Sequence, residues 1–101
     1  MKKCKNVQIG DVVRFPYHQF APYRRGWNGW LFKPGIVTRL YTSTQGKLCA
    51  EITYLYRDEE VKCRRLVEDL FQIDIDWAKR QKYEFGIINE EIKLLTMQGK
   101  I

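Results

Sequence analysis

Residues 33–56, KPGIVTRLYTSTQGKLCAEITYLY, contain two runs of alternating apolar and polar residues that flank a polar turn. A period of two residues is typical of a β-strand with one buried face. The turn, residues 42–46, ends in Gly46, and glycine adopts the positive φ that a hairpin loop of this length needs. The stretch therefore predicts a β-hairpin. The expected faces are Ile36, Thr38 and Leu40 in the first strand, and Leu48, Ala50, Ile52 and Tyr54 in the second.

The segments on either side of the hairpin supply three more strands. We expect them at residues 7–17, 61–66 and 71–75, with a one-turn helix at 67–70. An isolated hairpin is marginal in water, so these segments must cover it. Five strands in this order, with a long first loop, predict a mainly β fold. We expect a five-stranded SH3-like small barrel that hides most of its strand edges.

A C-terminal α-helical extension follows the expected barrel. Asp76 is expected to cap a short helical turn, and Asn89 is expected to cap a helix from Glu90 to Met97. The expected apolar stripe of that helix is Ile88, Ile92 and Leu95, with Trp77, Tyr83 and Phe85 packed beneath it. We therefore expect a single domain over residues 1–101, with the barrel at about 7–75 and a helical lid at about 76–99.

The composition is that of a globular chain, with 45% hydrophobic and 30% charged residues. No apolar run approaches the ~20 residues that span a bilayer, and the opening MKKCK is not followed by an apolar signal core. We therefore expect a cytoplasmic protein with no membrane partner. The three cysteines, Cys4, Cys49 and Cys63, form no Cys-x-x-Cys pair and are expected to be reduced. With only one histidine beside them, we expect no metal site and no cofactor.

The formal charge of +6 is unevenly distributed. Residues 1–40 hold eight basic side chains and one acidic side chain, a net of +7, whereas residues 41–101 hold ten basic and eleven acidic side chains, a net of −1. A concentrated positive field attracts polyanions such as nucleic acid, or an acidic protein surface. The alternative is a solvated surface that only aids solubility.

Residues 17–32 have neither a helical nor a strand period, and long irregular connections often carry function. This segment and its flanks gather aromatic rings beside Arg14, Arg24, Arg25 and Lys33. Rings stack on unpaired bases, at ~1 to 3 kcal/mol per base, and arginines neutralise phosphates. The alternative is that the rings close the barrel ends beneath the arginine stems, and Phe15 and Phe32 are expected in the core. The expected nucleic-acid contacts are Arg14, Arg24, Arg25, Lys33 and Arg39 for phosphates, and Tyr23, Trp27 and Trp30 for stacking.

Conventional catalytic groups are scarce in this sequence. His18 is the only histidine and Ser43 the only serine, which argues against a serine triad, and a Cys–His pair would need a cysteine to reach His18. The sequence therefore favours a binding protein over an enzyme. RNA cleavage by a cation and a nearby hydroxyl nevertheless leaves little sequence trace.

Four short motifs resemble the MazF/PemK toxin family. They are Gly10-Asp11-Val12-Val13, Lys33-Pro34-Gly35-Ile36-Val37, Ala50-Glu51-Ile52-Thr53, and residues 67–75 followed by Asn89-Glu90-Glu91. The resemblance covers most of the chain and implies a metal-independent endoribonuclease that an antitoxin neutralises. It places Lys33 at the catalytic arginine of that family and Thr53 at its catalytic threonine or serine. Lysine lacks the planar two-point contact of arginine, and the loop at 17–32 is longer and more aromatic than is usual there.

Three functions therefore remain open from the sequence. The first is a non-enzymatic barrel that binds single-stranded RNA or DNA, whose ~3 to 5 phosphate contacts would give a log-log salt slope of about −2 to −5. The second is a toxin-type ribonuclease. The third is a docking module for an acidic protein or peptide. A small barrel fold does not decide among these functions, because unrelated functions occur on one fold.

Overall fold

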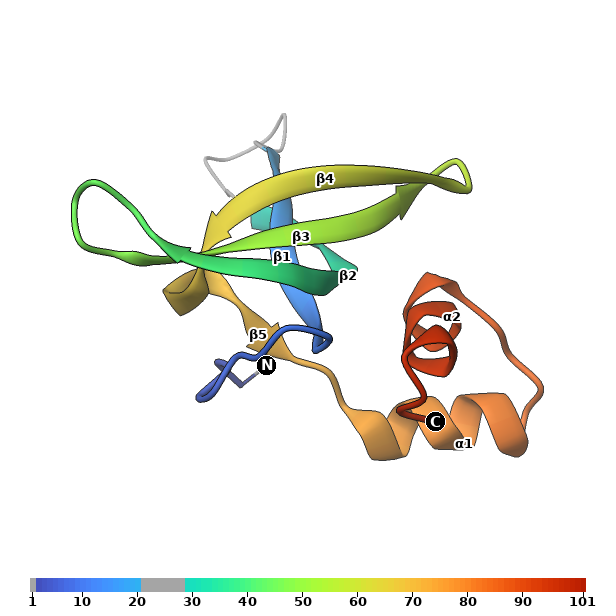
Figure 1. Cartoon of the computed structure of the whole chain (residues 1–101). Helices are drawn as coiled ribbons and strands as arrows, with labels where there is room; N and C mark the ends of the chain where they lie inside the picture. Colours follow the sequence, from blue (N-terminus) through green and yellow to red (C-terminus); the bar gives the residue numbers. More distant parts are fainter. Residues whose placement is uncertain (1, 21–28) are drawn as a thin grey trace.

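A five-stranded antiparallel sheet forms the body of the molecule (Figure 1). The computed structural model describes residues 2–20 and 29–101, with the backbone alone at 18–20, 29 and 30. The strands are β1 (Val12–Phe20), β2 (Gly29–Thr42), β3 (Leu48–Tyr56), β4 (Glu59–Leu66) and β5 (Phe71–Gln72), with a 3-10 turn, η1 (Val67–Asp69), before β5. Their order in the sheet is β4-β3-β2-β1-β5. The mainly β prediction is confirmed, but the sheet of the described residues is open, because β4 and β5 lie at opposite edges.

The central hairpin forms as predicted, with β2 and β3 antiparallel. Its loop ends at Gly46, where φ is +81°, and the Gly46 amide donates to the Ser43 carbonyl at 2.9 Å. The face predicted for β3 is also confirmed at three positions, which are all buried in one cluster: Ala50, Ile52 and Tyr54.

The register of β2 against β3 shifts at Thr38. Thr38 is the extra residue of a β-bulge, and such a bulge moves the later side chains of the strand to the opposite face. Leu40 therefore packs in the same cluster as Val37, whereas Ile36 packs in the cluster under the helices. The predicted common face of Ile36, Thr38 and Leu40 is wrong, because an alternating pattern does not reveal where a strand bulges.

The described parts of the predicted irregular loop, residues 17–20 and 29–32, are β-structure. β1 and β2 pair as far as Phe20 opposite Gly29, and residues 21–28 lie outside the described residues. A second register shift lies between Pro16 and His18. A bulge breaks the period of two and proline donates no ladder hydrogen bond, so the strand pattern of this segment is obscured in the sequence.

Two strand boundaries also differ from the prediction. The first strand begins at Val12 rather than at residue 7, because residues 8–11 form a turn in which Gly10 has a φ of +95°. In that turn the Asp11 carboxylate accepts a hydrogen bond from the Gln8 amide at 2.9 Å. The last strand ends at Gln72 rather than at residue 75, because the chain turns into a helix almost at once.

Each side of the sheet carries a hydrophobic cluster, and we call these sides the inner and the outer face. The inner cluster is Val13, Phe15, Val37, Ala50, Ile52, Tyr54 and Leu70, and the outer cluster is Val12, Leu55, Ile73, Ala78, Ile92, Leu94 and Leu95. The predicted core position of Phe15 is confirmed, since its side chain is fully buried. Phe32 is only half-buried.

The second helix, α2 (Glu90–Met97), covers one end of the outer face, away from the β2–β3 turn (Figure 1). It begins at the predicted cap, where the Asn89 side chain accepts from the Ile92 amide at 2.9 Å. Ile92 and Leu95 of the predicted stripe are buried, whereas Ile88 precedes the helix and is exposed. No helix in the described part of the chain is both long enough and apolar enough to cross a bilayer.

The first helix, α1 (Ile75–Tyr83), lies beside α2 (Figure 1). It is capped by Asp74, which accepts from the Trp77 amide at 3.0 Å, so the predicted cap at Asp76 is wrong. Ala78 is the buried residue of α1, and its small side chain lets the helix approach the outer cluster closely. The aromatic residues that were expected beneath α2 are exposed instead: Trp77, Tyr83 and Phe85.

The β5 edge of the sheet pairs with the N-terminal segment, and β4 at the other edge contacts β1 through a side chain. The N-terminal segment covers β5, because the Gln72 amide donates to the Lys2 carbonyl at 2.8 Å and the Cys4 amide to the Leu70 carbonyl at 3.0 Å. On the inner face, Arg65 of β4 reaches across to β1. The Arg65 side chain donates through Nε to the Pro16 carbonyl at 2.8 Å. A side chain thus connects two strands that are not neighbours in the sheet.

Candidate functional site

The predicted nucleic-acid contacts fall into two groups. Arg14, Lys33 and Arg39 lie in the described strands. Five others carry no side-chain description: Tyr23, Arg24, Arg25 and Trp27 lie outside the described residues, and Trp30 is described only as a β2 position opposite Gln19. Arg14, Lys33 and Arg39, with their neighbours, are therefore the described candidates for a site.

Arg14 of β1 forms an ion pair with Glu91 of α2. Its Nε donates to Glu91 Oε1 at 2.6 Å and its Nη2 donates to Glu91 Oε2 at 3.0 Å. Its hydrogen bonds to this carboxylate raise the pKa of Arg14 further. The Arg14 and Glu91 side chains are 28% and 9% exposed, so the pair connects β1 to α2 and the Glu91 carboxylate balances the charge of Arg14.

Lys33 is enclosed by aromatic rings on the inner face. Its Nζ lies 5.0, 5.4 and 5.7 Å from the ring centroids of Tyr17, Tyr54 and Tyr56. The same ammonium donates to the Leu55 carbonyl at 3.0 Å, and a carboxylate oxygen of α2 lies 3.6 Å away. This lysine is therefore an interior cation with its own set of partners.

The two residues that the toxin resemblance singles out lie on different faces of the sheet. Lys33 is directly opposite Phe15, which is on the inner face, and Thr53 is directly opposite Ile36, which packs in the outer cluster. Residues directly opposite each other in a strand pair share a face. Among the described contacts, no hydrogen bond joins Lys33 to Thr53.

Arg39 belongs to a cationic cluster on the outer face, beyond the part that the helices cover. The cluster consists of Arg39 and Tyr41 of β2, Glu51 of β3, and Lys62 and Arg64 of β4, and we call it the outer-face cluster. Glu51 is at its centre, because it is directly opposite Arg39 on one side and Arg64 on the other.

The geometry of the outer-face cluster leaves most of its positive charge exposed. The Glu51 carboxylate lies 3.7 Å from Arg39 Nη2 and 3.8 Å from Lys62 Nζ. The Tyr41 ring centroid lies 4.8 Å from Arg39 Cζ and 5.9 Å from Arg64 Cζ. The Arg39 and Lys62 side chains are 52% and 68% exposed, against 18% for Glu51. Three cations and one carboxylate leave a net charge of +2 on a sheet face.

Tyr41, Lys62 and Arg64 were missed by the sequence analysis. A partial signal was present, because Lys62 and Arg64 alternate along β4 and so share a face. Their alignment with Arg39 depends on the bulge at Thr38, which determines the face on which Arg39 lies. Cross-strand register of this kind is not readable from one strand alone.

Two of the three cysteines, Cys4 and Cys63, have thiols that resist ionisation. All three thiols are free. Burial raises the pKa of Cys63, and burial together with the Asp11 carboxylate raises the pKa of Cys4. Because the thiolate is the reactive form, neither of these two thiols is primed for attack at neutral pH. No group of three or more His, Cys, Asp or Glu residues suited to a metal ion occurs in the described part of the chain.

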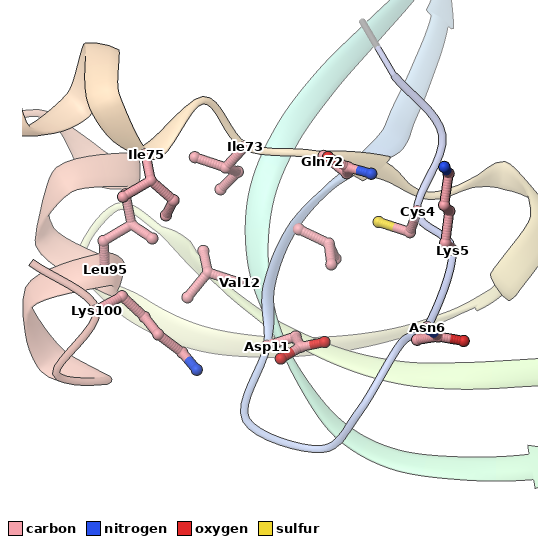
Figure 2. Close-up of a pocket in the computed structure, with 11 residues that line it drawn as sticks. Cys4, Lys5, Asn6, Asp11, Val12, Gln72, Ile73, Ile75, Leu95 and Lys100 are labelled. Carbon is pink, nitrogen blue, oxygen red and sulfur yellow. The ribbon is translucent and has the colours of Figure 1, made fainter.

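Cys4 also lines a pocket of about 330 Å³ between the N-terminal segment and the helices. Figure 2 shows the Cys4 side chain pointing into it, with Val12, Ile73 and Leu95 forming an apolar wall. The Lys100 and Asp11 side chains lie at its margin (Figure 2). This pocket separates the N-terminal segment from the outer cluster and holds no arrangement of groups with an evident chemical task.

A second cleft, of about 470 Å³, has a different character. Phe32 and Phe71 meet in it edge to face, with ring centroids 5.1 Å apart and planes at 86°. Lys3 Nζ lies 4.5 Å above the Phe71 ring and donates to the Glu68 carbonyl at 2.6 Å. The remaining lining residues are Pro16, Arg65 and Asp69. We call this cleft the phenyl cleft.

Comparisons of the chain with protein-family models, with curated proteins and with solved structures gave no match. The resemblance to the MazF/PemK toxins accordingly stays a prediction, and the function has to be inferred from the geometry of the chain itself.

Proposed function

We propose that this protein binds single-stranded nucleic acid through the outer-face cluster and does not cleave it. One observation carries the proposal: Arg39, Lys62 and Arg64 gather around a single carboxylate, Glu51, on an exposed sheet face. A compact exposed group with a net charge of +2 is suited to a polyanion.

The cations of the cluster are spread over two strands, so one bound strand can contact several of them. They come from β2 and β4, which lie ~9.6 Å apart because each is one strand spacing of ~4.8 Å from β3. The two arginines lie over one tyrosine ring, which restricts the positions that the guanidinium groups adopt. A guanidinium group that is held in place forms charge-assisted, often two-point hydrogen bonds to phosphate at a smaller entropic cost.

The proposal includes an SH3-like classification of the sheet. Three features support it: the strand order β4-β3-β2-β1-β5, the 3-10 turn before β5, and the long antiparallel pair of β1 and β2. The hydrogen bond from Arg65 to the Pro16 carbonyl draws β4 toward β1 across the inner face. On this interpretation the barrel is half open, and its outer face is the surface that carries the cluster.

The proposal is tested by equilibrium binding of a fluorescently labelled ten-nucleotide single strand. The variant is Arg64→Ala, and the matched control is Arg80→Ala, which removes the same charge from an exposed position of α1 outside the cluster. Loss of one phosphate contact is expected to weaken binding by about 3- to 10-fold in Arg64→Ala, whereas Arg80→Ala stays within about twofold. Equal effects of the two substitutions would reduce the binding to net charge, and no binding at low salt would remove the proposal.

A further inference from the structure

The phenyl cleft combines features that the outer-face cluster does not share. Its apolar wall is built from Pro16, Phe32 and Phe71, three half-buried residues of three different strands. The edge-to-face arrangement of the two phenyl rings leaves them at nearly right angles, so they form a corner rather than a closed stack. A corner of this kind accommodates a flat aromatic group against one ring with its edge toward the other.

Two cations border the cleft. Lys3 is held above Phe71 by its hydrogen bond to the Glu68 carbonyl. Arg65 donates through Nε to Pro16 and through Nη1 to the Arg64 carbonyl. A guanidinium group has five N–H donors, so three donors of Arg65 are not used in the described contacts. The cleft therefore offers a flat apolar wall beside positive charge, which matches a nucleobase attached to phosphates.

One acidic residue, Asp69, completes the lining. It is half-buried at the end of η1, two residues before Phe71. An ionised carboxylate only accepts hydrogen bonds. Cytosine, adenine and guanine have an exocyclic amino group that donates to such an acceptor, whereas uracil and thymine have a carbonyl oxygen in place of the cytosine amino group and offer only a ring N3–H flanked by two carbonyl oxygens, which a carboxylate repels.

We infer that the phenyl cleft holds one base of the bound strand and prefers a base with an exocyclic amino group. The inference rests on the proposed function, because it assigns a base subsite to the strand whose phosphates the outer-face cluster contacts. In this arrangement Phe71 is a stacking residue, Asp69 is a specificity-determining residue, and Lys3 and Arg65 contact the flanking phosphates.

The test compares ten-nucleotide strands of cytidine and of uridine on the full chain. Both bases are single-ring pyrimidines on the same backbone, and they differ at the position where cytosine has its amino group. The wild-type protein is expected to bind the cytidine strand at least about fivefold more tightly, and Asp69→Ala is expected to bring the two affinities within about twofold. Phe71→Leu is expected to weaken both strands by about 5- to 10-fold, because it removes the stacking ring. The matched control Tyr83→Leu removes an exposed ring of α1 and leaves both affinities unchanged.

The possible results separate this inference from the proposed function. Equal wild-type affinities for the two strands, or a cytidine preference that survives in Asp69→Ala, overturn the base subsite while leaving nucleic-acid binding in place. Failure of both strands to bind overturns the proposed function and the subsite together. Asp69→Ala is the decisive variant, since no described hydrogen bond depends on the Asp69 side chain, whereas Phe71 also lies in a paired strand.

Discussion

Arg14 and Glu91 are 77 positions apart in the chain and form a two-point ion pair between β1 and α2. Glu91 is the one charged residue that the described part of the chain buries. A buried carboxylate is costly to desolvate unless its charge is matched and its oxygens accept hydrogen bonds, and Arg14 meets both conditions. The pair therefore fixes the helical extension to the sheet, and it removes Arg14 from the cations available to a ligand.

Breaking this pair is expected to destabilise the fold. Glu91→Gln leaves the Arg14 guanidinium half-buried without its counter-charge, which is expected to cost about 2 to 4 kcal/mol of the free energy of unfolding. Urea denaturation followed by circular dichroism measures the loss. The matched control is Glu68→Gln, in an ion pair with Lys47 whose side chains are both more than half exposed, and it is expected to cost less than about 1 kcal/mol.

Gly35 is expected to tolerate no side chain, although its φ is ordinary. A methyl group there would lie 2.4 Å from Ile52 Cγ2, 3.0 Å from a Phe15 ring carbon and 3.2 Å from the Thr53 carbonyl oxygen. Gly35→Ala is therefore expected to lower the free energy of unfolding by about 1 to 3 kcal/mol through overpacking of the inner cluster. A thermal midpoint equal to that of the wild type would contradict the packing described for β1, β2 and β3.

Substitution of Lys33 tests whether the protein binds RNA or cleaves it. Its ammonium is bonded inside the inner face, so Lys33→Ala is expected to lower the thermal midpoint while nucleic-acid affinity stays within about twofold. The wild-type protein is expected to leave a long RNA intact in the presence of a metal chelator, as gel electrophoresis would show. Cleavage by the wild type that disappears in Lys33→Ala would establish the toxin-type ribonuclease instead.

The docking alternative would be favoured by a protein partner that is still captured after nuclease treatment.

Stability is expected to fall as the pH rises into the alkaline range. Burial raises the pKa of the Cys63 and Cys4 thiols and of the Tyr54 hydroxyl in the folded chain. An unfolded thiol ionises from about pH 8.5 and an unfolded tyrosine from about pH 10, while the folded chain retains these protons to higher pH. The unfolded state then binds fewer protons, so the free energy of unfolding decreases with pH.

Urea denaturation at several pH values between 7 and 10.5 measures this dependence. Cys63→Ala removes one of the three groups and is expected to make the decline between about pH 8.5 and pH 10 shallower, with the Cys4 thiol accounting for what remains there. A decline of the same steepness in the variant and in the wild type would show that the Cys63 thiol does not contribute.

The sequence predicted those parts of the fold whose signal is local. The hairpin at residues 33–56 has an alternating pattern and a glycine at its turn, and α2 has a capping asparagine at its start, and both were located correctly. The errors occur where one extra residue changes the register. The bulge at Thr38 moves the later side chains of β2 to the opposite face. The register shift after Pro16 interrupts the alternating pattern, so the pairing of β1 with β2 at residues 18–20 is not visible in the sequence.

The candidate site was less predictable than the fold, for the same reason. Counting cations in residues 1–40 grouped Arg14, Lys33 and Arg39 together, whereas their partners separate them. Arg14 donates hydrogen bonds to Glu91, and Lys33 lies among three tyrosine rings. Of these three cations, only Arg39 belongs to an exposed cluster. Partners of this kind come from strands and helices far away in sequence, so charge patterning alone does not identify a free cation.

The salt dependence of single-strand binding tests the central proposal most directly. The three phosphate contacts of the outer-face cluster, made by Arg39, Lys62 and Arg64, are predicted to contribute about −2 to the slope of log binding constant against log salt concentration, since each contact on a single strand contributes about −0.7. The slope is predicted to become shallower by about 0.7 in Arg64→Ala and to stay at the wild-type value in Arg80→Ala. Absence of binding at low salt, or a slope that Arg64→Ala leaves unchanged, would contradict the assignment of the outer-face cluster as the nucleic-acid interface.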